Sequence, residues 1–196
     1  MVYHISNLNR ISASDINLVV KHLEMGEVLV LPTDTIYGLS CLATDKEAVS
    51  RIFALKKRPK DKPFILLVSS LKMALEYVKV DDEKIKKIEK IWQEDKPTTI
   101  ILPSKKIFPE GIVSKSGNIS LRLPKSHFLI KIIERIKVPL VSTSLNLSGE
   151  PAIKDVSSLE SVFKENSPDF IFDVGVLDKE PSCIIDFSGS EPLIIR

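Results

Sequence analysis

The sequence predicts a mixed α/β domain built around one twisted sheet. Its 196 residues, 43% of them hydrophobic, suffice for one core and are few for two. Short apolar runs typical of buried strands alternate along the chain with segments of helical spacing. The last expected strands have no helix between them, so the sheet should not be purely parallel. We therefore expect a single domain over residues 1–196.

Apolar residues at spacings of three and four, preceded by capping residues, predict the helices. They fall at residues 14–25, 45–58, 71–77, 82–92 and 129–136. Ser12 or Ser14 can cap the first, and Pro59 ends the second near Arg58 by removing a backbone donor. Residues 157–160 match a capping box and predict a further helix.

Short apolar runs bounded by Pro, Gly or polar residues predict the strands. They fall at residues 28–31, 64–68, 98–102, 119–123, 139–142, 170–173, 183–187 and 192–195. In 119–123 the apolar residues alternate with Ser120 and Arg122, which share the other face. A mid-strand Arg122 is either on a solvated face or in a planar clamp for a carboxylate, and periodicity does not decide between them.

Composition narrows the class of protein. No apolar run approaches the ~20 residues that cross a bilayer, and the first residues lack a signal-peptide pattern, so we expect a cytoplasmic protein without membrane contact. Cys41 and Cys183 are isolated and should be reduced thiols. His4, His22 and His127 are equally scattered, and we expect no metal site built by the protein.

The charge distribution predicts a local anion site. The net charge of +2 is too mild for a dedicated, strongly basic nucleic-acid binder. Residues 56–62, however, pack five cations around one acid. Cations in the last turn of a helix also complement its dipole, so part of this cluster has a purely structural explanation. A polyphosphate is the ligand that would neutralise the remainder.

Three segments are candidates for a binding site, and each also has a structural explanation. Residues 32–39 follow a buried strand and carry hydroxyls, but they also fit a turn in which Asp34 bonds its own backbone. Residues 56–62 fit a helix end, and residues 138–149 fit a capped turn. No glycine-rich phosphate loop and no nucleophile elbow is present in the sequence.

In combination, these segments resemble a known family. PTDTIYGL, RIFALKKRPKDKP, SLRLP and STSLNLSG occur in the order and spacing of the threonylcarbamoyl-adenylate synthase family, also called YrdC-like. The match runs to the final residues 193–196, as in the short, single-domain members. The resemblance implies a YrdC-like catalytic domain over residues 1–196, with a twisted open mixed sheet, flanking helices and a concave, positively charged site.

The resemblance also implies which residues form this site. Lys56 and Arg58 match the family's K-x-R pair, to which we assign phosphate charge and catalysis, and Ser144 and Asn146 match its S-x-N pair. The threonine side is expected to comprise Thr35, Arg122, Ser142 and Ser182, with Arg122 gripping the carboxylate. The ATP side is expected to comprise Arg58, Lys62, Asn118, Ser144, Asn146, Ala152 and Arg196.

The chain departs from the family pattern mainly on the nucleotide side. Leu67 stands where the family often has His, and Ala152 stands where it has Ser or a similar residue. Residues 92–99 stand where the family has a W-P-G-P-x-T segment. Many members end in Arg-Pro-Gly, and of this ending only Arg196 is present here. Side-chain hydrogen bonds of the family at Leu67 and Ala152 are therefore lost.

The implied activity is the condensation of L-threonine, bicarbonate and ATP to threonylcarbamoyl-AMP and pyrophosphate, with Mg²⁺ arriving on ATP. The product would pass to a tRNA-modifying threonylcarbamoyl transferase complex, with at most weak direct contact to RNA. Two alternatives remain open at this point. One is an RNA- or tRNA-binding module of the same fold without turnover, and the other is a carbamoyl-transfer enzyme of related fold.

Overall fold

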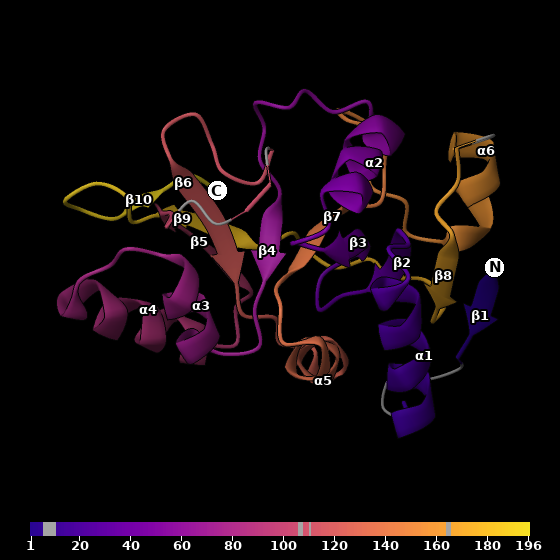
Figure 1. Ribbon diagram of the computed structural model, residues 1–196, viewed down its shortest axis with the longest axis horizontal. Coiled ribbons are helices and arrows are strands. Elements are labelled where there is room, and N and C mark those ends of the chain that lie inside the picture. Colours follow the sequence, from indigo (N-terminus) through magenta and orange to yellow (C-terminus); the bar gives the residue numbers. More distant parts are fainter. Residues whose placement is uncertain (6–10, 106–107, 110, 164–165) are drawn as a thin grey trace.

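Strands from all parts of the chain form one twisted, mixed sheet in the computed structural model, which describes residues 1–5, 11–105, 108–109, 111–163 and 166–196 (Figure 1). The described strands, in spatial order, are β1 (Val2–His4), β8 (Phe170–Asp173), β2 (Leu29–Pro32), β3 (Tyr37–Leu42), β7 (Leu140–Ser144), β4 (Ile65–Leu67), β6 (Asn118–Arg122), β5 (Thr98–Pro103), β9 (Cys183–Asp186) and β10 (Leu193–Ile194). Parallel pairs such as β4–β6 adjoin antiparallel pairs such as β4–β7. The predicted mixed, open sheet is confirmed.

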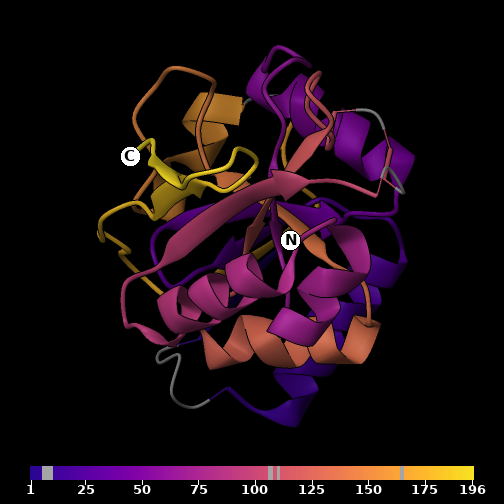
Figure 2. The same ribbon diagram turned by 90° about the vertical axis from the view of Figure 1, so that its left-hand side faces the viewer.

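Helices flank this sheet. They are α1 (Ala13–Glu24), α2 (Lys46–Lys56), α3 (Leu71–Tyr77), α4 (Asp82–Gln93), α5 (His127–Ile136) and α6 (Leu159–Phe163). In Figure 1, α3, α4 and α5 lie below the strands and α2 lies above them. Figure 2, turned by 90°, shows α3 and α4 in magenta and α5 in coral grouped below the strands again. Within the described residues, no helix is long and apolar enough to span a bilayer.

Most predicted elements are confirmed, and their caps explain the boundaries. Ser12 caps α1 in a capping box with Asp15, and Asp45 caps α2 by accepting from two backbone N–H groups. The prediction that Pro59 ends α2 near Arg58 was wrong. The helix already ends at Lys56, because Lys57 adopts a left-handed conformation with φ of 49°.

Two further predictions need correction. Residues 157–160 do not form the opening capping box, because Asp155 accepts from Ser157 N and caps the 3-10 turn η2 (Val156–Ser158) ahead of α6. The second half of the segment 32–39 is not a loop but the start of β3, which pairs antiparallel with β2. The short edge strand β1 was not predicted.

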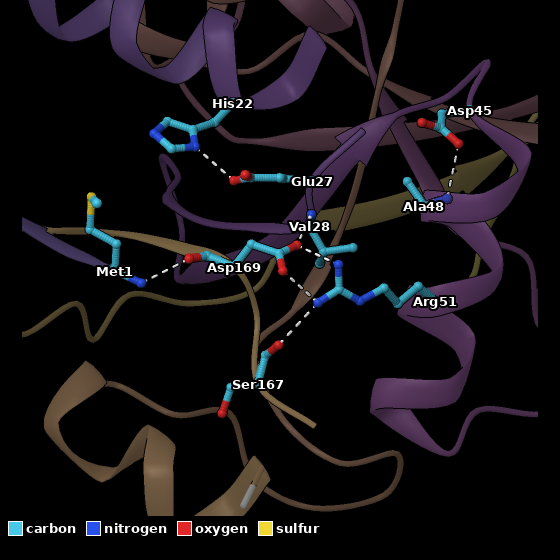
Figure 3. A network of polar contacts seen from close by, with 9 residues as sticks. All are labelled: Met1, His22, Glu27, Val28, Asp45, Ala48, Arg51, Ser167 and Asp169. Carbon is cyan, nitrogen blue, oxygen red and sulfur yellow. Dashed lines mark hydrogen bonds and ion pairs between the residues drawn. The ribbon is translucent and has the colours of Figure 1, made fainter. Parts of the chain in front are cut away.

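A polar network around Asp169 joins the start of β8 to three other segments (Figure 3). The Asp169 carboxylate accepts from both terminal nitrogens of Arg51 on α2, and from Val28 N at 2.8 Å. Its backbone oxygen accepts from the Met1 ammonium at 2.8 Å. Burial raises the pKa of Asp169, but the hydrogen bonds from Arg51 and Val28 outweigh it and lower the pKa overall.

We expect Asp169→Asn to lower the free energy of unfolding by about 1–2 kcal/mol at pH 7. Arg51 loses its negatively charged partner, and the backbone N–H of Val28 loses a charged hydrogen-bond acceptor. The pKa of Asp169 is lower in the folded protein than in the unfolded chain. The stabilisation is therefore fully present at pH values above the pKa of the unfolded chain, and it is lost as the pH falls through the pKa of the folded protein. Urea denaturation at pH 7 and pH 3 measures both effects. Asp178→Asn, which breaks an exposed ion pair with Lys154, is the matched control and should change little. Equal losses in both variants would contradict the prediction.

Candidate functional site

A cavity of about 370 Å³ lies on the middle strands of the sheet. Its floor follows from register, because Ser142 of β7, Ile65 of β4, Ser120 of β6 and Ile101 of β5 are paired in one row. All four line the cavity. Successive side chains of a strand alternate between faces, so this row turns toward the cavity while its neighbours face the opposite way. The row places two serine hydroxyls on the cavity floor between isoleucine side chains.

The turn between β2 and β3 forms one wall. Thr33 and Thr35 are 5% and 3% exposed, and their hydroxyl oxygens lie 2.9 Å apart. Thr33 Oγ1 also donates to Ile36 O at 2.6 Å. A Cβ on Gly38 would lie 2.8 Å from Ser142 Oγ, so β3 approaches β7 here too closely for a larger residue. The wall thus presents hydroxyls at fixed positions.

Asp34, in the same turn, does not bond its own backbone, so that interpretation of the segment was wrong. Its carboxylate accepts from Arg122 Nη2 at 3.1 Å and from Lys125 N at 2.9 Å. Both side chains of the Asp34–Arg122 pair are 6% exposed. Arg122 lines the cavity, so the solvated-face alternative for this residue is also wrong.

The charge of Arg122 is only partly compensated. Burial lowers the pKa of its guanidinium, Asp34 raises it, and the positive charge of Arg196 lowers it. Its Nε is buried and has no hydrogen-bond partner among the described residues. A buried donor without a partner is rare and costs about 1–3 kcal/mol. The protein itself therefore leaves one donor of this cavity residue unsatisfied.

Lys56, at the end of α2, ties the loop after β7 in place. Its ammonium donates to Ser144 O, to Asn146 O at 3.0 Å and to Asn146 Oδ1. Ser144 Oγ donates to the same Asn146 Oδ1 at 2.8 Å. The side chain is 1% exposed, and burial followed by the nearby charge of Arg58 lowers the pKa of Lys56 to about 7. The K-x-R and S-x-N segments are therefore one hydrogen-bonded unit.

The lowered pKa of Lys56 predicts a pH dependence. Between about pH 7 and the unfolded pKa of about 10.4, the unfolded chain binds more protons at this residue than the native one. Stability contributed by Lys56 should therefore rise with pH across this window. We expect the wild type to gain stability relative to Lys56→Met between pH 7 and pH 9.5. Urea denaturation at both pH values measures the difference in unfolding free energy. A constant difference would contradict the lowered pKa.

Arg58 and the chain end complete the cavity. Arg58 donates from Nε to Lys62 O at 2.8 Å and from Nη2 to Pro63 O at 3.1 Å, which shapes the loop before β4. Burial lowers the pKa of Arg58. On the far side, Arg196 donates from two nitrogens to Ser182 O, at 3.1 and 3.0 Å. Among the described residues, those that line the cavity include three Arg and no Asp or Glu.

The structure brings most of the predicted site residues together. Those that line the cavity are Thr35, Arg58, Arg122, Ser142, Ser144, Ala152, Ser182 and Arg196. Lys56 and Asn146 adjoin it through their bonds to Ser144. Lys62 and Asn118 are not among the lining residues; Lys62 is exposed and Asn118 lies at the start of β6, opposite Pro103.

Several residues at or next to the cavity were not predicted from the sequence. Thr33 and Tyr37 line the cavity, and Thr99 Oγ1 lies 3.0 Å from Ser182 Oγ. Thr33 and Tyr37 stand inside the segment 32–39, so the signal was present but not assigned residue by residue. Thr99 closes the segment 92–99, which was noted only as a departure from the family pattern, and the parallel pairing of β5 with β9 brings it near Ser182.

Fold and cavity together define the class: an α/β protein with a basic, hydroxyl-lined cavity on a mixed sheet, suited to small anionic ligands. The chain belongs to the Sua5/YciO/YrdC family, whose model, described as "Telomere recombination", matches residues 21–196.

Relatives include the threonylcarbamoyl-AMP synthases of Mannheimia succiniciproducens (32% identical, covering 76% of this chain and 82% of the relative) and Coxiella burnetii (35% identical, 76% and 79%).

Two solved structures are similar over the whole chain. Pyrococcus abyssi Sua5 complexed with L-threonine gives a TM-score of 0.87 at 27% identity, and this chain corresponds to 57% of that protein. Escherichia coli YciO gives a TM-score of 0.85 at 27% identity, with 93% of that chain covered. The YrdC-like fold implied by the sequence motifs is confirmed.

Proposed function

We propose that this chain is an L-threonylcarbamoyladenylate synthase and therefore a nucleotidyltransferase. The observation that carries the proposal is the convergence of Arg58, Arg122 and Arg196 with a hydroxyl-rich lining in one cavity. Relatives named threonylcarbamoyl-AMP synthase and the Sua5 structure with L-threonine support the choice of substrates. The tRNA-modifying transferase complex that would take up the product, and a cytoplasmic location, are part of the same proposal.

The proposed reaction has two steps. The neutral amine of threonine attacks the carbon of bicarbonate, a C–N bond forms, and water leaves to give a carbamate. A carbamate oxygen then attacks the α-phosphorus of ATP and expels pyrophosphate. The first step also moves one proton from the amine nitrogen to the departing hydroxyl, which leaves as water, whereas the second step needs no proton transfer. Both steps bring anions together, so positioning and preorganised positive charge should supply most of the rate. A site rich in Arg and hydroxyl groups fits this requirement.

On the threonine side, we assign the carboxylate to Arg122, whose Nε lacks a partner, and the hydroxyl and methyl to Thr35, Ser142 and Ser182. A pocket that hydrogen-bonds the substrate hydroxyl can reject valine strongly, whereas one methyl separates threonine from serine by only about 1–3 kcal/mol. We therefore expect stronger selection against valine than against serine.

On the nucleotide side, we assign phosphate charge to Arg58, with Ser144, Ala152 and Arg196 around the nucleotide and Lys62 and Asn118 at its periphery. Lys56 touches three protein oxygens, so we assign it the positioning of Ser144 and Asn146 rather than direct contact with phosphate. No group of three His, Cys, Asp or Glu residues among the described positions could hold a metal. The expected Mg²⁺ would be held by the phosphate oxygens of ATP.

The proposal is tested by pyrophosphate release from ATP, with threonine and bicarbonate each omitted in turn. Release that requires both substrates supports it. Release that is the same without threonine would contradict it, and so would no release combined with tight RNA binding, as expected of a binding module. Carbamoyl phosphate, offered as a substitute for bicarbonate and ATP, tests for a carbamoyl-transfer enzyme.

A further inference from the structure

Among the ion pairs of the described residues, the Asp34–Arg122 pair is the most buried, with each side chain 6% exposed. The two residues are 88 positions apart, and their contact joins the β2–β3 turn to the end of β6. Asp34 also accepts from Lys125 N at 2.9 Å, which fixes the carboxylate against the backbone that leads into α5. Asp34 is thus held from two directions, while only one of its contacts is to a cavity residue.

The guanidinium of Arg122 is left partly free by this arrangement. Nη2 is engaged by Asp34 at 3.1 Å, whereas Nε is buried and without a partner among the described residues. A guanidinium is planar, so fixing one nitrogen of a side chain packed at the end of a strand also fixes the direction of the other donors. Arg122 lines the cavity, so the orientation of its guanidinium decides which donors a ligand there can meet.

We infer that Asp34 is a positioning residue for substrate recognition: it holds the Arg122 guanidinium in the orientation that receives the carboxylate of the amino-acid substrate. The inference rests on the proposed function, since it assigns a carboxylate-bearing substrate to this end of the cavity. Asp34 does not itself touch the substrate, and it acts through Arg122.

Charge neutralisation and orientation of Arg122 by Asp34 predict effects of opposite sign on the binding of an anionic group. If Asp34 only neutralised Arg122, removing its charge would leave the cavity more positive and strengthen the binding of an anionic group. If Asp34 orients Arg122, removing its charge frees the guanidinium to rotate and weakens binding. Asp34→Asn keeps the shape of the side chain and separates these cases.

The experiment measures L-threonine binding by calorimetry in the wild type, Asp34→Asn, Arg122→Gln and the double variant, with exposed Asp95→Asn as the matched control. We expect Asp34→Asn to raise the dissociation constant for L-threonine at least about tenfold. Without the Asp34 charge, Arg122 no longer keeps the orientation in which it donates a hydrogen bond to the substrate carboxylate. In the Arg122→Gln background the same change should alter binding less than about twofold. Unchanged or tighter binding, or an equal loss in both backgrounds, would overturn the inference.

A readout independent of turnover keeps this inference separate from the proposed function. The side-chain ¹⁵Nε–H signal of Arg122, assigned by its loss in Arg122→Gln, should report an ordered group in the wild type and a lower order parameter in Asp34→Asn. An unchanged order parameter would overturn the positioning role of Asp34. Failure of the wild type to bind threonine would refute the proposed function instead, and the order parameter would still test the role of Asp34.

If Asp34→Asn does not fold, Asp34→Glu provides the test. It keeps the charge but moves the carboxylate by one methylene, so a positioning role still predicts weaker threonine binding and a less ordered Arg122. Threonine binding equal to that of the wild type would contradict it.

Discussion

Lys56→Met is expected to lower kcat/KM for threonylcarbamoyl-AMP formation by about 100-fold. Methionine keeps most of the length of the buried side chain but removes the donor to Ser144 O, Asn146 O and Asn146 Oδ1. These oxygens would be left without the ammonium that holds them, at about 1–3 kcal/mol for each one that stays buried. The end of β7 would then no longer hold Ser144 in its place at the cavity.

The matched control is Lys57→Met, because Lys57 is the next residue, is exposed and carries the same charge. Steady-state kinetics should show little change in this variant. Thermal unfolding of both variants separates loss of the site from loss of the fold. If Lys56→Met stays folded and within about threefold of the wild type in kcat/KM, Lys56 has no positioning role.

Arg122→Gln is expected to raise the KM for threonine about 100-fold or more, while the KM for ATP changes little. A charge-assisted bidentate contact to a carboxylate combines two hydrogen bonds of about 1.5–3 kcal/mol each. Glutamine cannot present the same fork, and it leaves Asp34 as a buried carboxylate without its cationic partner. Initial-rate kinetics with each substrate varied in turn measure the two KM values.

Arg122→Lys refines this prediction, because lysine keeps the charge and loses the planar fork. We expect it to recover only a small part of the lost threonine affinity. Exposed Arg135→Gln on α5 is the control for loss of one positive charge. An equal rise in both KM values, or a full recovery by lysine, would contradict a specific grip on the threonine carboxylate.

Local patterns in the sequence predict most of the fold. The continuous apolar run of β2 and the helical spacing of α5 identify strand and helix directly, because the spacing of apolar residues along the chain shows which faces of an element are buried. β3 was missed because Tyr37–Leu42 contains Gly38 and Ser40, which weaken the strand pattern. Gly38 lines the cavity, and a Cβ there would lie 2.8 Å from Ser142 Oγ.

The composition of the site was predictable from motifs, but its internal contacts were not. Asp34 and Arg122 meet across 88 positions, and Lys56 meets Asn146 across 90. No local pattern encodes such pairs, because they depend on which strands become neighbours in the sheet. For the same reason, a lysine that is 1% exposed could not be distinguished from an exposed lysine at a helix end.

The most direct test of the account is the transfer of labelled bicarbonate carbon into an adenylate. The wild type, incubated with ATP, Mg²⁺, L-threonine and ¹³C-bicarbonate, should form threonylcarbamoyl-AMP that carries one ¹³C by mass spectrometry, together with an equal amount of pyrophosphate. A folded protein that consumes no ATP under these conditions, or that releases pyrophosphate without a labelled, threonine-containing adenylate, would contradict it.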